Sequence, residues 1–163
     1  MTAALAVVEP VVYSKRRRAM RAAWVRLVRE APVEETAPAK IRGPADVVRL
    51  LRPRAAVELV EVFYCVALGA ASNVLAVCEV TRGVVNSSLV HPREVFRIAL
   101  ALGASGIVIG HNHPSGDPSP SIDDRTVTRQ LVDAGRLLDV PVYDHVILGA
   151  GERYTSMAEA GLL

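Results

Sequence analysis

Apolar residues recur at helical spacing in two long segments of the chain. Residues 93–102 and 122–138 each repeat apolar side chains at the three- and four-residue intervals of one helix face. Gly103 follows the first segment, at the position where helices commonly end in a left-handed residue. A shorter apolar pattern after Pro44 predicts another helix. We expect Pro53 to end it, because proline lacks the amide hydrogen that a helix interior needs.

Runs rich in Val, Ile and aromatic residues predict four strands, which are residues 57–70, 73–85, 105–110 and 141–149. Only a short turn separates the first two strands, so they are expected to form an antiparallel hairpin. The residues after the fourth strand are too few to assign. The order strand, strand, helix, strand, helix, strand predicts an α/β domain in which helices flank a mixed sheet.

The region before this domain has a different composition. Residues 14–29 contain seven basic side chains and no acidic one, and a partial apolar stripe predicts a helix. Three prolines and a glycine between residues 30 and 44 are typical of a linker. We therefore divide the chain into a basic N-terminal helix with a Pro-rich linker, residues 1–40, and one domain, residues 41–163.

Composition excludes several classes of protein. The 163 residues are 51% hydrophobic and 22% charged, which excludes wholesale disorder, collagen and coiled coil. The net charge of +2 is too small to indicate nucleic-acid binding over the whole surface. The longest apolar stretch, residues 62–71, is much shorter than the roughly 20 residues that cross a bilayer. With two separated cysteines and no signal-peptide pattern, a cytoplasmic protein without membrane contact is expected.

Candidate metal ligands follow the third predicted strand. His111 and His113 are two residues apart, so in extended chain both imidazoles point to the same face while Asn112 points to the other. Asp124 lies in the first turn of the next predicted helix, where its carboxylate can supply an oxygen ligand. Two nitrogens and one oxygen leave a fourth tetrahedral position open, as a catalytic zinc ion requires.

Each of these features also has an ordinary structural explanation. A His-x-His pair on a strand is more often simply two histidines. Ser121 and Asp124 fit a capping box, in which serine and an acidic residue three positions later stabilise a helix start. The metal hypothesis depends on the coincidence of these features within one short stretch.

A hydrolase would also need a general base, and two glutamates are candidates. Glu94 lies in the first turn of the helix that leads into the histidine strand, so the topology is expected to bring it to the same sheet edge. Its acidic side chain would also suit a helix start without any catalytic role. Glu79, in the preceding strand, is the alternative base. His145 could hydrogen-bond a metal ligand without contacting the metal, although an ordinary buried or edge histidine explains it as well.

The segment HNHPSGDPSPSIDD fits the pattern H-x-H-P-x(6)-S-x(2)-D. Together with SSLVHPREVFRIAL, it resembles the RadC-type branch of the JAB/MPN (JAMM) metalloprotease-like domains. The resemblance implies a cytidine-deaminase-like three-layer α/β sandwich and a zinc ion bound by His111, His113 and Asp124. It further implies that Ser121 hydrogen-bonds the bound water or the developing oxyanion. The shared Pro-Arg-Glu string favours Glu94 as the acid/base.

Two functions follow as hypotheses. The first is a zinc-dependent metallohydrolase that cleaves a peptide or isopeptide bond in a protein or peptide substrate. The alternative is a DNA-associated accessory protein in repair or recombination, with a non-catalytic metal site and weak nucleic-acid contact through residues 14–29. A zinc nucleobase deaminase fits less well, because neither Cys65 nor Cys78 is placed to be a ligand. Exposed strand edges make a homodimer plausible.

Overall fold

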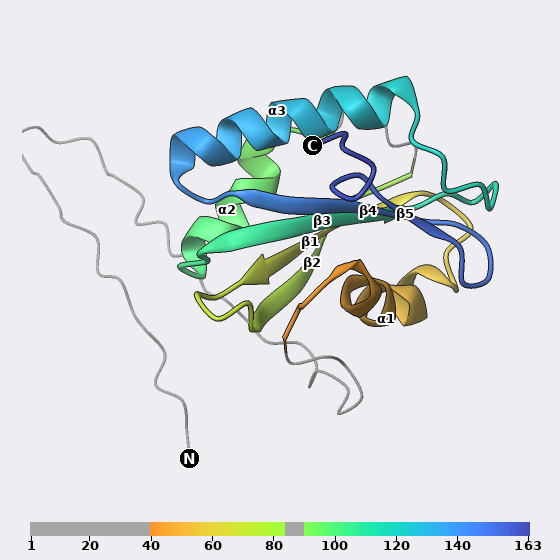
Figure 1. Ribbon diagram of the computed structural model, residues 1–163, viewed down its shortest axis with the longest axis horizontal. Helices are drawn as coiled ribbons and strands as arrows, with labels where there is room; N and C mark the ends of the chain where they lie inside the picture. Colours follow the sequence, from red (N-terminus) through yellow and green to blue (C-terminus); the bar gives the residue numbers. More distant parts are fainter. Residues whose placement is uncertain (1–39, 84–89) are drawn as a thin grey trace, which may run out of the picture. The chain divides into compact units, whose positions relative to one another are not determined.

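The computed structural model describes residues 40–83 and 90–163, which form a five-stranded sheet with helices on both faces (Figure 1). In chain order the elements are α1 (Pro44–Ala55), β1 (Val62–Leu68), β2 (Val74–Arg82), α2 (Pro92–Ala101), β3 (Gly106–Asn112), α3 (Ile122–Leu138), β4 (Val142–Leu148) and β5 (Tyr154–Ser156). The basic segment of residues 14–29 and the division near residue 40 involve residues outside the described ones. None of the described helices has the length and apolar character that spanning a bilayer requires.

The sheet is mixed, and its strand order is β2-β1-β3-β4-β5. β1 pairs antiparallel with both β2 and β3, whereas β3 and β4 run parallel and are connected through α3. Because β1 and β3 are antiparallel, the start of β1 lies beside the end of β3, with Phe63 opposite His111. The candidate site lies at this end of β1 and β3.

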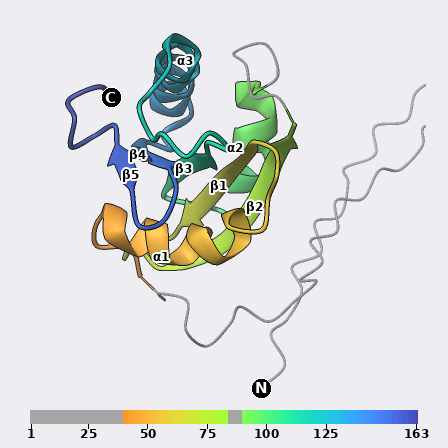
Figure 2. The ribbon, with the colours of Figure 1, turned by 90° about the vertical axis from the view of Figure 1, so that its right-hand side faces the viewer.

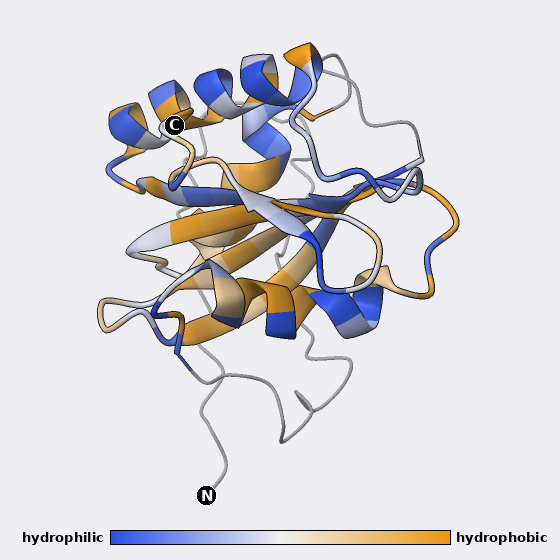
Figure 3. Ribbon diagram, turned by 45° about the vertical axis from the view of Figure 1, so that its right-hand side comes forward, coloured by the Kyte–Doolittle hydropathy of each residue, from blue (hydrophilic) through white to orange (hydrophobic). Residues whose placement is uncertain are grey.

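Two apolar clusters hold the helices against the sheet, one on each face. α1 covers one face, and α2 and α3 cover the other (Figure 2). Much of the sheet between them is hydrophobic, whereas α3 carries hydrophilic residues along its outer side (Figure 3). β1 and β3 are buried along their whole length, because both of their faces are covered. This arrangement confirms the predicted α/β class and the three layers.

Two local predictions were wrong. Pro53 does not end the first helix, because α1 continues to Ala55. Proline removes only one hydrogen bond in the last turn, and the side chain of Arg54 donates to Leu50 O at 2.8 Å in the same turn. The first strand starts at Val62 rather than at residue 57, since β2 ends at Arg82, opposite Val62.

The other predicted elements lie where their patterns placed them, although residues 84 and 85 of the second predicted strand lie outside the described residues. α3 spans the predicted residues, and Gly103 has a φ of +62°, which is the left-handed conformation expected after a helix. β3 continues beyond the predicted residue 110 to Asn112, so His111 belongs to the strand itself. β5 was not predicted. The expected homodimer stays a prediction.

Candidate metal centre

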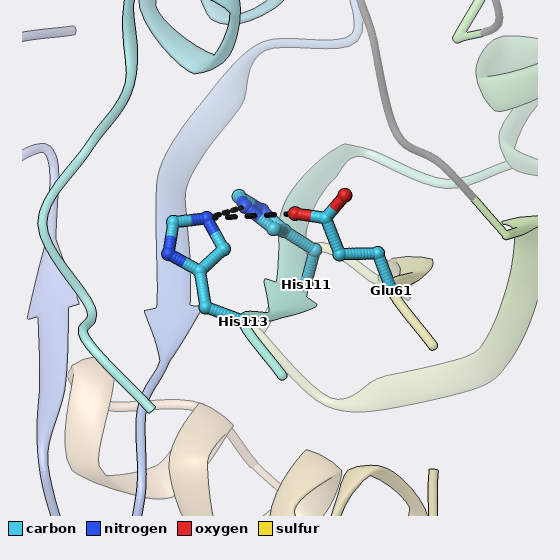
Figure 4. Close-up of side chains that lie close together, drawn as sticks. All are labelled: Glu61, His111 and His113. Atoms are coloured by element: carbon cyan, nitrogen blue, oxygen red, sulfur yellow. Dashed lines mark hydrogen bonds and ion pairs between the residues drawn. The ribbon is translucent and has the colours of Figure 1, made fainter. Parts of the chain in front are cut away.

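The end of β3 presents two imidazoles to one point. His111 is the second-last residue of the strand and is fully buried, and its ring stacks on Phe63 with centroids 5.9 Å apart. His113 follows directly after the strand. The Nε2 atoms of the two histidines lie 2.9 Å apart, and Figure 4 shows the two rings turned toward each other. The extended backbone therefore places both side chains on the same face, as their spacing predicted.

Asp124 reaches the same point from the first turn of α3. Its Oδ1 lies 3.1 Å from His111 Nε2, and its Oδ2 lies 3.5 Å from His113 Nε2. Ligands bound to zinc at about 2.0–2.1 Å in tetrahedral geometry are separated from one another by roughly 3.3 Å. The spacing of the three side chains therefore suits a tetrahedral cation.

Hydrogen bonding determines which nitrogen of His113 carries the proton. His113 Nδ1 lies 2.6 Å from Asp117 O, and a carbonyl oxygen can only accept. Nδ1 must therefore be the protonated nitrogen of the neutral ring. This leaves the lone pair of His113 on Nε2, directed toward His111 and Asp124.

A buried chain of hydrogen bonds determines the tautomer of His111 in the same way. Thr128 Oγ1 donates its single proton to Asp124 O at 2.5 Å, so it must accept from His145 Nδ1 at 2.6 Å. His145 Nε2 then has the lone pair and accepts from His111 Nδ1 at 2.8 Å. The remaining lone pair of His111 is therefore also on Nε2. The sequence left the role of His145 open, and the structure places it directly behind His111.

The donor set fits a cation, because two imidazole lone pairs face each other at 2.9 Å beside a carboxylate. Without a proton or a metal ion between them, these lone pairs would repel. The hydrogen bond with Asp124 is the largest effect on His113, and it raises the pKa of that imidazole. Burial opposes ionisation of Asp124, but interactions with His111 and His113 outweigh it and hold the pKa of the carboxyl well below its usual range. Burial lowers the pKa of His145, which keeps this ring neutral.

Ser121 joins the helix cap to the candidate site. Its backbone N and its Oγ both donate to Asp124 Oδ2 at 2.7 Å, and Asp124 N donates to Ser121 Oγ at 3.0 Å. The structure thus contains the capping box that the sequence indicated. The two interpretations are compatible, because the bonds that cap α3 also hold the Asp124 carboxylate toward the histidines.

The glutamate beside the histidines is Glu61, which no sequence motif indicated. Its Oε1 lies 3.7 Å from His113 Nε2, and with His111 and His113 it forms a group whose potential ligand atoms lie within 4.8 Å of one another (Figure 4). The pairing of β1 with β3 is the signal that could have indicated Glu61. The two strands are antiparallel and Phe63 pairs with His111, so Glu61 falls opposite His113.

Neither predicted base lies in this group. Glu94 forms ion pairs with Arg93 and Arg97, at 3.4 Å and 3.2 Å. Glu79 is paired with Arg82 at 2.7 Å, and this hydrogen bond lowers the pKa of its carboxyl. Placement at a helix start or in a neighbouring strand defines where the main chain lies, but not where a side chain points.

Comparison with known proteins agrees with the fold. The pattern that defines the RadC-like JAB domain family matches residues 41–162. The chain belongs to this family. This confirms the resemblance seen in the HNHP segment, and it confirms the JAB/MPN type of fold.

Several RadC-like relatives are similar to this chain. UPF0758 protein STH371 of Symbiobacterium thermophilum is 47% identical over 121 residues, which are 74% of this chain and 51% of the relative. A UPF0758 protein of Moorella thermoacetica is 47% identical over 123 residues, 76% of this chain and 53% of its own length. A UPF0758 protein of Methanosarcina acetivorans is 43% identical over 124 residues, which are 76% of this chain and 54% of the relative. The chain thus spans about half the length of the curated relatives it matches.

A cavity of about 430 Å³ opens beside the candidate metal centre of this RadC-like JAB domain. His113 and Asn112 line it at the end of β3, and the end of α1 and the turn after β4 form its other walls. Most of the wall residues are small or have short side chains. They include Ala55, Ala56, Pro114, Gly116, Gly149, Ala150 and Gly151. Arg52, Glu58 and Glu152 also line the cavity, so its wall carries charges of both signs.

Proposed function

We propose that this RadC-like JAB domain is a zinc-dependent hydrolase that cleaves a peptide or isopeptide bond. The observation that carries the proposal is the convergence of the two imidazole Nε2 atoms, 2.9 Å apart, with the Asp124 carboxylate within 3.5 Å. A glutamate that is not needed as a ligand stands next to them. Together they supply the parts of a site that activates water.

The ligand set favours zinc and leaves room for chemistry. His111, His113 and Asp124 would hold the ion through two nitrogens and one oxygen, which is a set of three, as in catalytic zinc sites. A zinc ion bound in this way lowers the pKa of a coordinated water from about 16 toward about 7 and polarises a carbonyl group. A structural zinc site is normally closed by four protein ligands.

Glu61 is the general base in this proposal. Glu61 is the residue directly before β1, and its Oε1 is 3.7 Å from His113 Nε2. Its carboxylate would take a proton from the attacking water and deliver it to the leaving amine. General acid–base catalysis of this kind contributes about 10²–10⁴-fold to the rate. In this proposal Glu61 takes the role expected from the sequence for Glu94, with Glu79 as the alternative.

Ser121 supports the site mainly through Asp124. Its hydroxyl proton is donated to Asp124 Oδ2, so contact with a developing oxyanion would require the hydroxyl to leave this bond. The cavity beside His113 would hold the chain on one side of the bond that is cut.

The test combines metal analysis with turnover of the full chain. Protein purified without chelators should contain about one zinc ion, and a library of fluorogenic peptides and isopeptides should include a substrate. Glu61→Gln should keep the zinc and lower kcat by about 10²–10⁴-fold. The matched control, Glu94→Gln, should leave kcat unchanged. Metal-free wild-type protein, or unchanged turnover of the Glu61 variant, would contradict the proposal.

A further inference from the structure

We infer that Asn112 is a positioning residue that holds Glu61 opposite His113. This role rests on the proposed function, because it matters for catalysis only if Glu61 is the base. The geometry itself is independent of the reaction. Asn112 is only 6% exposed, and it lies between the two histidines in sequence but bonds in the opposite direction, toward β1.

The Asn112 carboxamide hydrogen-bonds the backbone on both sides of Glu61. Val62 N donates to Asn112 Oδ1 at 2.9 Å, and Asn112 Nδ2 donates to Val60 O at 3.0 Å. One side chain therefore bonds the residue before Glu61 and the residue after it. Both polar atoms of the amide have partners, so the amide plane is fixed relative to this stretch of backbone.

On the β2 side, Gly83 N donates to Glu61 O at 2.9 Å, whereas on the β3 side the strand pairs end before this segment and Asn112 makes the contact. The last paired residues of β1 and β3 on this side are Phe63 and His111, and Glu61 precedes β1. Leu59 is 92% exposed and Val60 is 41% exposed, so the backbone leading to Glu61 gains little from apolar packing. The Asn112 side chain thus continues the pattern of donor and acceptor that a further ladder rung would have supplied.

An amide is the side chain that this position needs. The backbone on either side of Glu61 offers one N–H and one C=O, and a carboxamide supplies one acceptor and one donor at matching ends. Aspartate could accept from Val62 but could not donate to Val60, and leucine could do neither. With bonds to the residues on either side, the backbone of Glu61 is held at the position from which its carboxylate reaches His113. A misplacement of 1 Å in such a group can cost about 100-fold in rate.

The experiment uses Asn112→Leu, which removes both bonds at similar volume, and Asn112→Asp, which keeps only the bond from Val62. Asn73→Asp is the matched control at the opposite end of β1. All full-length variants should retain about one zinc ion, because no proposed ligand is changed. Asn112→Leu should lower kcat by about 100-fold. If this variant does not fold, Asn112→Asp provides the test with a smaller loss, whereas the control should match wild type.

A double-mutant comparison separates positioning from general structural damage. If Asn112 acts through Glu61, then Asn112→Leu or Asn112→Asp should cause no further loss of kcat in a Glu61→Gln background. The same loss in both backgrounds would overturn the inference. So would wild-type turnover of the Asn112 variants when Glu61→Gln is inactive.

Two readouts do not need activity. Asn112→Leu should remove the hydrogen-exchange protection of the Val62 amide, while Asn112→Asp should keep it. With cobalt(II) in place of zinc, the visible spectrum of either Asn112 variant should shift from that of wild type toward that of Glu61→Gln. Spectra identical to wild type would overturn the inference even if no peptide substrate were found. If the spectra shift while hydrolysis is absent, the positioning role stands and the proposed function fails.

Discussion

His145 Nε2 accepts a hydrogen bond from His111 Nδ1 at 2.8 Å, and both rings are completely buried. The two residues belong to parallel neighbouring strands, β4 and β3. Through this bond, a residue with no direct access to the site determines that the free lone pair of His111 is on Nε2. Groups behind a metal ligand commonly fix its tautomer and its ring orientation in this way.

The same relationship predicts the effect of changing Thr128, which accepts from His145. Thr128→Val keeps the shape but leaves the buried His145 Nδ1 proton without its acceptor. Zinc affinity should fall by about 10–100-fold, and unfolding should become easier by roughly 1–3 kcal/mol. Competition with a chromophoric chelator and denaturant titration would measure the two effects.

Thr126→Val is the matched control for this prediction. Thr126 Oγ1 makes the same type of bond, to Ile122 O one turn back, but it is exposed and contacts no histidine. Equal zinc affinities for the two variants would show that the bond to His145 does not support the site.

Zinc binding should release a proton near neutral pH. The hydrogen bond with Asp124 raises the pKa of His113, so metal-free protein keeps this proton at pH values where an ordinary histidine, with a pKa of about 6.5, has begun to lose it. Zinc affinity should therefore fall as the pH falls through the raised pKa. Calorimetry in two buffers with different ionisation enthalpies would count the protons, and a count of zero just above pH 6.5 would contradict the pKa shift.

The same shift predicts how metal-free stability depends on pH. Because the pKa of His113 is raised in the folded state, the His113–Asp124 pair contributes fully to the free energy of unfolding below the unfolded-state pKa of about 6.5. This contribution is lost as the pH rises through the folded-state pKa. The difference in unfolding free energy between wild type and His113→Ala should shrink over that range. Chemical denaturation at several pH values in the presence of a chelator would measure it. A difference that is constant with pH would be inconsistent with the pair.

Ser121→Ala should weaken both the helix and the site. Loss of the cap should cost about 1 kcal/mol in the free energy of unfolding. Of its two bonds from Ser121, Asp124 Oδ2 would keep only the one from the backbone. Zinc affinity should fall along with stability. Ser105→Ala is the control, because Ser105 is exposed beside the start of β3. A stability loss without any change in zinc affinity would limit Ser121 to helix capping.

Gly149 allows the His113 loop to pack closely against the turn after β4. A Cβ atom at this position would lie 2.7 Å from Gly116 O and 2.8 Å from Pro118 Cδ. Gly149→Ala should therefore displace this loop, lower stability by about 1–3 kcal/mol and reduce zinc affinity. Gly43→Ala is the control, because a Cβ there meets nothing within 4 Å. Equal behaviour of the two variants in denaturation and zinc titration would be inconsistent with this close contact.

The parts of this protein that local sequence determines were predictable. α3 follows from its apolar spacing and its capping box, because both act within a few residues. His111 and His113 point to the same face because side chains two residues apart in a strand do so. Asp124 meets them because a short loop connects the end of β3 to the start of α3. These relationships need no knowledge of the rest of the chain.

Only the tertiary structure decided which distant side chains complete the site. Asn112 meets Val62 across 50 residues of sequence, and His111 meets His145 across 34. Such contacts depend on strand order and register, which result from burying both faces of the sheet under helices rather than from any local pattern. For this reason the histidines were evident in the sequence, whereas Glu61 could be recognised only once β1 was known to run antiparallel beside β3.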